Sequence, residues 1–555
     1  MVFSARSLVL SAVWLSTMGV NTDSPFNWDT LLPSTKLDWK PCYSGIECTR
    51  LIVPLDYDSS AAGNATIAIA RYPSTSSKSD YLGPILLNPG GPGSSGVDYV
   101  VEVGAELATL LGNEFDLVGF DPRGVSYSTP AVSWFKSDAE RALWVPTSGY
   151  PALDESANAI AEQWARAQVQ GQLAEERGQG YLQHITTDNT ARDMVRIMEA
   201  FGQEKLQYWG ISYGSALGAT FAALFPDKVG RVVIDGVLDM DAWYSANLTV
   251  EETDTDKALQ MFADGCFAAG PNDCAFYAPS SAQITANLQA LLASVKTNPL
   301  PVITPISYDV FGYTLLKNSL FTSLYSATSL FQLLAEGLAN LAKGNASTIY
   351  TSFVQVPPFE CPADSNSTSP PIPFHHNTFE ALWSIACNDA SAVNDTVSEL
   401  QQFYSEAQKV SSFADLWANW RVVCSGWKVH RPGRFSGPVR AANTSFPLLV
   451  VGNTVDPVTP ISGAIKTAQA FPGSVLLTLD AVGHTSVNAP STCVFDYLRE
   501  YFVNGTLPEV GTVCTPNAPV FPSSEGNSTA SGRRDLKSSE AGRAIGAAQR
   551  RVTGH

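Results

Sequence analysis

The pattern Gly-x-Ser-x-Gly, set between a strand and a helix, constrains this chain more than any other feature. Ser212 is its central residue, in the stretch YWGISYGSALGATFAALFP. The apolar run LQYW before it is typical of a buried strand, and ALGATFAALF after it is typical of a helix that ends at Pro226. Gly210 and Gly214 permit a sharp, strained turn that exposes the serine hydroxyl. The pattern therefore predicts Ser212 as a nucleophile; the alternative is a Gly/Ser turn without chemistry.

A glycine-rich loop ahead of this turn is suited to hold a negative charge. The apolar strand PILLN (84–88) runs into PGGPGSSG (89–96). A glycine backbone brings free N–H groups close to a substrate without obstructing side chains. We expect the amides of Gly91 and Tyr213 to form an oxyanion hole. A phosphate-binding loop is the weaker alternative, because the glycines do not follow G-x-G-x-x-G and no P-loop lysine follows.

One histidine of the six in the chain is placed to act as a base. His484 follows the apolar strand 475–479 and precedes a helix that begins near Pro490. It occupies the last strand–helix junction, where the base belongs in the chain order Ser, Asp, His. The remaining histidines lack such a strand end or lie in exposed or terminal stretches; they are His184, His375, His376, His430 and His555.

An acid is expected at the end of the preceding strand. Asp456 follows the apolar strand 447–451, and one helix and one strand fit between it and His484. Its role would be to hold the imidazole tautomer and to stabilise the imidazolium. Two alternatives are Asp480, in the histidine's own loop, and Asp235, which ends the strand RVVID. The chain order favours Asp456.

The chain also resembles a known family. The stretches LLNPGGPGSSG, DLVGFDPRG, YWGISYGSALGATFAALFPDKVGRVVIDGV, LLVVGNTVDPVTP and GHTSV resemble the secreted tripeptidyl/prolyl aminopeptidase group of α/β hydrolases. The resemblance is dense over 82–237 and 446–514 and thin between. The turn GVSYS (124–128) departs from it, because it lacks the second glycine usual there.

The resemblance implies an α/β-hydrolase fold, with a mostly parallel, doubly wound sheet and a large, mainly helical cap. It also implies the roles already given to Ser212, Asp456 and His484. We expect a core over 20–237 and 444–520, a cap over 238–443 and a disordered basic tail over 521–555. Members of the group act at peptide N-termini, or as esterases and amidases on small molecules.

The start of the chain and its sequons predict secretion. Arg6 and the apolar run 8–20 are typical of a signal peptide over 1–19, the alternative being an uncleaved anchor. Eight Asn-x-Ser/Thr sequons predict N-glycosylation. They begin at Asn64, Asn247, Asn345, Asn366, Asn394, Asn443, Asn504 and Asn527.

Nine cysteines follow no CxxC or Cys/His metal spacing, so disulfides are the better interpretation. Short loops favour three pairs, Cys42–Cys48, Cys266–Cys274 and Cys493–Cys514. A fourth pair, Cys387–Cys424, would leave Cys361 unpaired. We expect neither a metal nor an organic cofactor.

Charge limits the partners of the chain. A net charge of −18 argues against nucleic acid and anionic membranes. Acidic residues near the start of the insertion could bind a substrate ammonium group, although solvated surface acids are more common. These residues are Asp239, Asp241, Glu251 and Glu252.

Together these features predict a secreted serine hydrolase that forms an acyl-enzyme and acts on peptides or on small esters and amides. An exopeptidase at free N-termini is the leading hypothesis. The alternatives are an esterase or amidase acting on a small metabolite, and a non-catalytic binding protein on the same fold.

Overall fold

The computed structural model describes residues 26–145, 151–178, 180–305, 307–354, 377–522 and 540–547. The predicted signal peptide, Cys361, His375 and His376 lie outside these ranges.

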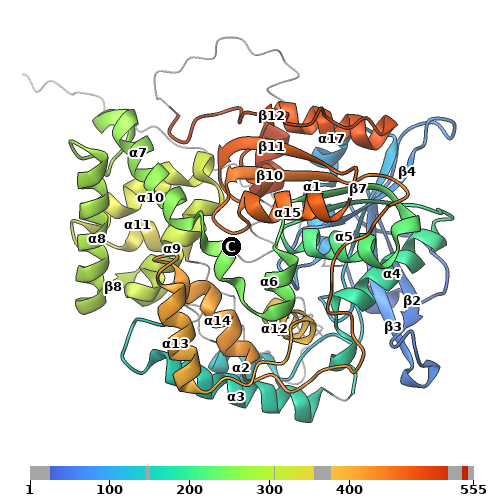
Figure 1. The fold of residues 1–555 in the computed structure, drawn as a ribbon, viewed down its shortest axis with the longest axis horizontal. Coiled ribbons are helices and arrows are strands. Elements are labelled where there is room, and N and C mark those ends of the chain that lie inside the picture. Colours follow the sequence, from blue (N-terminus) through green and yellow to red (C-terminus); the bar gives the residue numbers. More distant parts are fainter. Residues whose placement is uncertain are drawn as a thin grey trace, which may run out of the picture.

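A ten-stranded sheet forms the centre of the hydrolase core (Figure 1). Its strand order is β1-β2-β3-β5-β4-β6-β7-β10-β11-β12, antiparallel from β1 to β5 and parallel from there on. The strands are β1 Lys40–Tyr43, β2 Ile46–Pro54, β3 Asn64–Tyr72, β4 Gly83–Asn88, β5 Phe115–Phe120, β6 Leu206–Ile211, β7 Val229–Asp235, β10 Leu449–Val455, β11 Val475–Val482 and β12 Val513–Cys514. The α/β-hydrolase fold predicted from the sequence is confirmed.

Helices cover both faces of the sheet. Alternation along a strand divides its side chains between two cores: Leu86 lies in one, whereas Ile85 and Leu87 lie in the other. One face is covered by α1 Gly96–Leu111 and α17 Thr492–Asn504, and the other by α4 Thr187–Ala200, α5 Tyr213–Leu224 and α15 Ile461–Ala470. Shorter elements are η1 Trp28–Thr30, η2 Ser60–Ala62, η3 Leu182–His184, η4 Pro226–Lys228 and α16 Thr485–Asn488.

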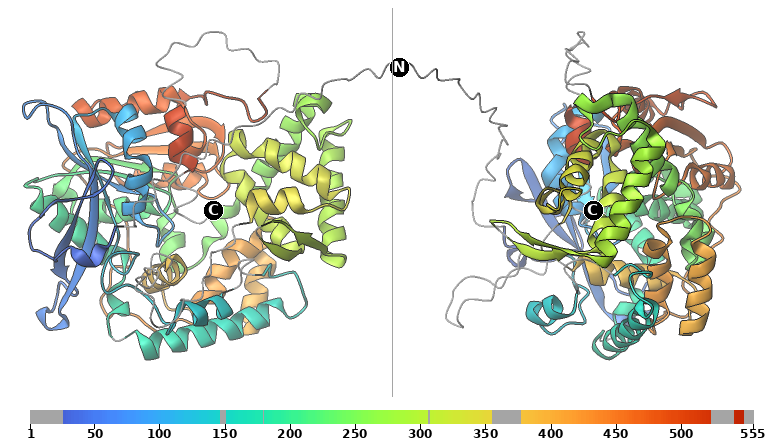
Figure 2. Two further views of the ribbon diagram at one scale, coloured as in Figure 1. Left: turned by 180° about the vertical axis from the view of Figure 1, so that it is seen from behind. Right: turned by 90° about the vertical axis from the view of Figure 1, so that its left-hand side faces the viewer.

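A mainly helical region lies beside the carboxyl ends of the parallel strands, and Figure 2 shows it from two further sides. Its helices are α6 Met240–Ser245, η5 Leu248–Glu252, α7 Thr255–Asp273, α8 Ser281–Thr297, α9 Tyr313–Tyr325, α10 Ala327–Leu341, α11 Ser347–Phe353, α12 Thr378–Asp389, α13 Val397–Ala407 and α14 Ala414–Cys424. One antiparallel strand pair, β8 Leu300–Ile303 and β9 Tyr308–Phe311, belongs to it. We call this region the cap.

The cap also includes helices from an earlier part of the chain, which corrects the predicted core boundary. α3 (Ala159–Arg177) packs on α13 and α14 in a separate apolar cluster that joins Ile160 to Leu400 and Val422. A Cβ on Gly171 would lie 1.7 Å from the Gly426 carbonyl oxygen, so the two backbones touch. α2 (Asp138–Trp144) lies beside α3 (Figure 1), and Arg141 bonds Glu380 of α12. The sequence assigned these helices to the core because nothing local distinguishes them from helices that cover a sheet.

Residues 540–547 form a helix, so the prediction of a disordered tail is wrong for that segment. Ala541 and Ile545 are buried, and their spacing of four places both on one helix face. Beside them, Gly542 and Gly546 let the helix approach closely: a Cβ on Gly546 would lie 2.4 Å from the Val487 carbonyl oxygen.

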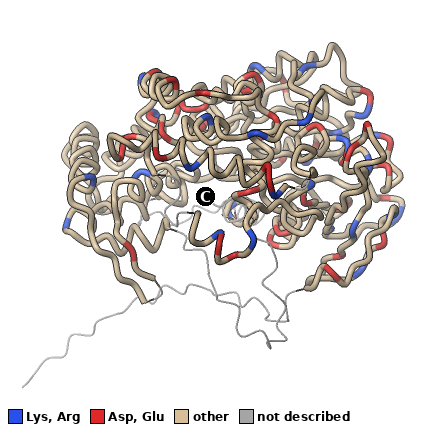
Figure 3. The backbone as a smooth tube through the Cα atoms, turned by 90° about the horizontal axis from the view of Figure 1, so that it is seen from below, with Lys and Arg blue, Asp and Glu red and all other residues tan. Residues whose placement is uncertain are grey.

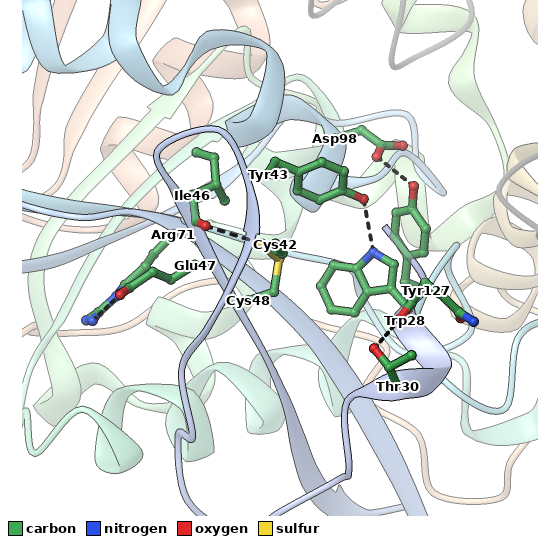
Figure 4. The surroundings of a disulfide bond; sticks show 11 residues. Trp28, Thr30, Cys42, Tyr43, Ile46, Glu47, Cys48, Arg71, Asp98 and Tyr127 are labelled. Atoms are coloured by element: carbon green, nitrogen blue, oxygen red, sulfur yellow. Dashed lines mark hydrogen bonds and ion pairs between the residues drawn. A yellow bond between two sulfur atoms is a disulfide. The ribbon is translucent and has the colours of Figure 1, made fainter. Parts of the chain in front are cut away.

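Four disulfides join the pairs that the sequence predicted: Cys42–Cys48, Cys266–Cys274, Cys387–Cys424 and Cys493–Cys514. The Cys42–Cys48 disulfide lies near a group of aromatic side chains close to the start of the described chain (Figure 4). There Trp28 donates a 3.2 Å hydrogen bond to the Tyr43 hydroxyl and stacks on Tyr127. The Tyr127 hydroxyl in turn donates to Asp98, in the first turn of α1.

Basic and acidic residues are both scattered over the described chain (Figure 3). Among the helices described, none has the length and apolar character needed to cross a membrane.

Candidate active site

The predicted nucleophile stands on a strained turn between β6 and α5. Ser212 has φ 59° and ψ −122°, which side-chain-bearing residues rarely adopt, and it is half-buried. A Cβ on Gly210 would lie 2.1 Å from the Gly214 carbonyl oxygen, and one on Gly214 would lie 2.7 Å from that of Asn88. Both glycines of the pattern are therefore required by close backbone contacts.

The structure places His484 against Asp456. Val455 and Val482 are paired in the sheet; Asp456 follows Val455 directly, and His484 lies two residues after Val482. His484 Nδ1 lies 3.0 and 3.1 Å from the two Asp456 carboxylate oxygens, and both side chains are fully buried. A carboxylate can only accept, so Nδ1 carries the proton and Nε2 is left as an acceptor.

The Asp456 carboxylate is held by its own turn. The backbone N–H groups of Val458 and Thr459 each donate to Oδ1 at 2.9 Å. Oδ2 accepts from the Thr459 hydroxyl at 2.9 Å and from the Thr485 N–H at 3.0 Å. Thr459 was not predicted from the sequence, although its position three residues after Asp456, where a hydroxyl can close a turn, is a local signal for this role.

The other ring nitrogen of the histidine is free. Within the described ranges, His484 Nε2 is buried and has no hydrogen-bond partner, so no Ser212–His484 hydrogen bond is formed. Such bonds are often long in free enzymes and tighten when substrate binds. The cap closes over this ring, since the Tyr325 ring meets it edge-on at 5.1 Å and the Tyr325 carbonyl accepts from the His484 N–H.

Asp235, the main rival acid, contacts neither nitrogen of the histidine. Its carboxylate accepts from the Ser486 N–H and hydroxyl, at 2.9 and 2.5 Å, while its carbonyl accepts from the Ser212 N–H at 2.8 Å. Asp235 thus joins the nucleophile turn to the histidine loop. Burial raises the pKa of Asp235 to about 6, although the Ser486 hydrogen bonds lower it. The other rival, Asp480, is exposed and accepts from the Thr454 hydroxyl.

The glycine-rich loop lies against the nucleophile turn. A Cβ on Gly90 would come within 2.8 Å of the Ser212 Cβ, so only glycine fits there. Among the described residues, the Gly91 N–H meets no hydrogen-bond acceptor. Tyr213 is the first residue of α5, where a helix leaves its N–H groups unpaired. Tyr213 therefore follows Ser212 directly, and Gly91 follows Gly90, the glycine that touches the Ser212 side chain.

Two of the four cap acids are buried rather than solvated. Asp239 and Asp241 pair with Lys466 near the surface, as common surface acids do. Glu251 instead accepts from the Asp239 N–H, and Glu252 is fully buried with no hydrogen-bond partner among the described residues for either carboxylate oxygen.

Glu252 lies in a cluster of buried charges beside the site. Burial raises its pKa to about 9; Asp415 and Asp256 raise it further, and Lys317 opposes them. Lys317 is itself bonded to Asp415. Three residues after Glu252, the Thr255 hydroxyl donates to the carbonyl of Pro457, the residue that follows Asp456. Within the described ranges no group of His, Cys, Asp and Glu could hold a metal ion.

Two families match the chain. The family described as alpha/beta hydrolase fold matches residues 83–272, and the family described as TAP-like protein matches residues 408–514. Serine protease Hip1 of Mycobacterium tuberculosis is 30% identical over 495 residues, which cover 86% of this chain and 91% of that protein. Tripeptidyl aminopeptidase of Streptomyces lividans is 28% identical over 87% of both chains. Carboxylesterase B of M. tuberculosis is 29% identical over 84% of this chain and 86% of the other.

Proposed function

Because the chain belongs to the α/β-hydrolase family with a TAP-like C-terminal region, and is a serine hydrolase, we propose that Ser212, His484 and Asp456 are its catalytic triad. The observation that carries the proposal is the buried His484–Asp456 pair, whose outer nitrogen is left without a partner. That arrangement keeps an acceptor nitrogen beside the nucleophile turn.

The reaction would proceed through an acyl-enzyme. Ser212 Oγ attacks the substrate carbonyl carbon while its proton passes to His484 Nε2. The amides of Gly91 and Tyr213 donate to the oxyanion that forms. When the intermediate collapses, the leaving amine or alcohol takes the proton from His484. A water molecule then attacks the ester through the same proton transfers, which releases the acid and restores Ser212.

Active-site labelling tests this assignment. The wild-type protein should react with a fluorophosphonate probe, and Ser212→Ala should lose both labelling and turnover. Ser245→Ala, which changes a more exposed serine of α6, is the control and should retain both. Full labelling of Ser212→Ala would disprove the assignment, and an unlabelled wild type would favour a non-catalytic binding protein.

We propose that the substrate is a peptide with a free N-terminus. Two of the relatives bear the names of peptidases. Glu252 provides a separate argument, because a buried carboxyl group without a partner is costly and an ammonium group would compensate it. Carboxylesterase B supports the alternative, an esterase or amidase acting on a small molecule.

A substrate panel distinguishes the two classes. Aminoacyl, prolyl and tripeptidyl chromogenic amides should be cleaved faster than their N-acetylated forms and than short acyl esters. Glu252→Gln should raise KM for the free amines about tenfold or more and leave ester hydrolysis unchanged, because only the amines carry the charge. Glu380→Gln, a buried acid of α12 that is paired with Arg141, is the matched control. Hydrolysis of esters alone would favour the esterase over the peptidase.

We also propose secretion and N-glycosylation. Four disulfides are expected of a protein that folds in an oxidising compartment. All six sequon asparagines within the described ranges are exposed: Asn64, Asn247, Asn345, Asn394, Asn443 and Asn504. Endoglycosidase treatment of the protein from a eukaryotic host should lower its apparent mass, and its N-terminus should begin near residue 20. An unchanged mass would contradict the glycosylation.

A further inference from the structure

A chain of buried hydrogen bonds joins the cap to the residue that follows the nucleophile. Asp389, the last residue of α12, accepts from the Thr187 hydroxyl at 2.5 Å and from the Thr187 N–H at 2.9 Å. The Thr187 hydroxyl also lies 2.5 Å from the Tyr213 hydroxyl. All three side chains are almost completely shielded from solvent.

The chemistry of these groups fixes the direction of the chain. An ionised carboxylate only accepts, so the single Thr187 hydroxyl proton points to Asp389. The Thr187 oxygen then accepts from Tyr213, whose own proton is oriented in turn. Asp389 receives one more donor, the Trp243 ring N–H at 3.0 Å, and the Trp243 ring packs on Tyr213 at 5.4 Å.

Three separate elements meet at Asp389. Thr187 is the first residue of α4, so the carboxylate lies at a helix N-terminus, where negative charge is favoured. Trp243 belongs to α6 and Asp389 to α12, both in the cap, whereas α4 belongs to the core. Burial raises the pKa of Asp389 to about 7, and the bonds from Thr187 and Trp243 lower it, so the group is mainly ionised at pH 8.

Tyr213 is where this chain of bonds would affect catalysis. Its backbone N–H is one of the two proposed oxyanion donors, and the residue before it has strained backbone angles. Strained turns persist only where the surroundings hold them in place. Anchoring the ring at its hydroxyl end restricts the position of residue 213 and therefore the direction of its amide.

We propose that Asp389 and Thr187 are positioning residues, which hold Tyr213 so that its amide points into the oxyanion hole. The inference rests on the proposed function. It implies that the hole is complete only when the cap is seated on the core, because the anchor lies in the cap.

Removing single hydroxyls tests the proposal. Thr187→Val and Tyr213→Phe should each lower kcat about tenfold at pH 8 with little change in KM, since complete loss of an oxyanion-hole donor costs about 10²–10³-fold and these variants only misdirect the donor. Thr187→Ser keeps the hydroxyl and should restore kcat. The double variant should be no worse than either single one, because both changes break the same chain.

Inhibitor binding separates positioning from general damage. A peptide boronic acid forms a tetrahedral adduct that uses the oxyanion hole, so its Ki should rise in proportion to the loss of kcat/KM. A non-covalent product peptide should bind Thr187→Val as it binds the wild type. The control is Glu380→Gln, which changes a buried acid on the same helix as Asp389 and should leave the boronate Ki unchanged.

An unchanged kcat in Thr187→Val would overturn the inference, and so would a lower kcat with an unchanged boronate Ki. An equal rise of the boronate Ki in Glu380→Gln would overturn it too, because any damage to the cap would then suffice. Where the Ser212→Ala variant is inactive, any of these results would overturn this inference and leave the proposed function in place. An active Ser212→Ala variant would instead remove the proposed function.

Discussion

The Asp235 carboxylate accepts a 2.5 Å hydrogen bond from the hydroxyl of Ser486, two residues beyond His484. Asp235 ends β7, which lies between β6 with the nucleophile and β10 with Asp456. It therefore fixes the loop that carries the imidazole without contacting the imidazole itself. Two buried acids next to one histidine thus have separate tasks, and substitution can tell them apart.

Asp456→Asn should lower kcat by roughly 10⁴, because an amide no longer fixes the histidine tautomer. Asp235→Asn should cost much less, within about tenfold, since the amide oxygen still accepts one bond from Ser486. Both rates are measured on the best substrate of the panel, with matched circular dichroism spectra as the folding control. Near-normal turnover in Asp456→Asn together with an inactive Asp235→Asn would show that Asp235, at the end of β7, is the catalytic acid.

Stability should fall as pH rises from about 6 to 9. Burial raises the pKa of Glu252 to about 9, of Asp121 to about 8 and of Asp389 to about 7. Carboxyl groups with a raised pKa bind more protons in the folded than in the unfolded chain, so folding is favoured at lower pH. Below about pH 6.5 this trend is opposed by His430, whose pKa burial lowers to about 4.

The measurement is Tm across this pH range. We expect a steady decline of Tm from pH 6 to pH 9. Glu252→Gln should flatten the decline, because the substituted side chain no longer titrates. Asp241→Asn, at an exposed acid, should leave the slope unchanged. A Tm that rises from pH 6 to 9 would contradict the expectation.

The sequence predicted the features that rest on local patterns. Apolar runs bounded by glycine or proline mark the strand, turn and helix around Ser212. The strand that precedes Asp456 is marked in the same way. Three of the disulfides were predicted from short separations, and the fourth was chosen among the three cysteines that remained, Cys361, Cys387 and Cys424. Neither kind of signal depends on how distant parts of the chain meet.

The sequence could not predict contacts between distant segments. Asp389 and Thr187 are 202 residues apart, and Tyr325 reaches His484 from the cap. No local sequence pattern indicates such a contact. The helix 540–547 was not predicted for a related reason. Its apolar face consists only of Ala541 and Ile545, and Gly542 and Gly546 are typical of a loop unless a helix packs closely against a neighbour.

Removal of the Cys387–Cys424 disulfide should destabilise the protein more than removal of Cys42–Cys48. The first closes a loop of 37 residues and the second one of 6. Loop-closure entropy corresponds to about 4 and about 2 kcal/mol, respectively. Denaturant unfolding of the two double Cys→Ala variants compares them directly. Since Cys387 lies two residues before Asp389, its loss should also lower kcat; equal stabilities and rates would refute both expectations.

Undocking the helix 540–547 should loosen the histidine loop. Ile545 is fully buried, and a Cβ on Gly546 would lie 2.4 Å from the carbonyl oxygen of Val487, within α16. Asn488 of the same element donates to the His484 carbonyl at 2.9 Å. Gly546→Val should therefore displace the helix, speed amide exchange over residues 485–488 and lower Tm by roughly 1 °C per kcal/mol of docking energy lost, a small shift because the chain is long. Glu540→Ala, at an exposed position of the same helix, should change neither. Unaltered exchange over 485–488 in Gly546→Val would show that the histidine loop is held without the helix.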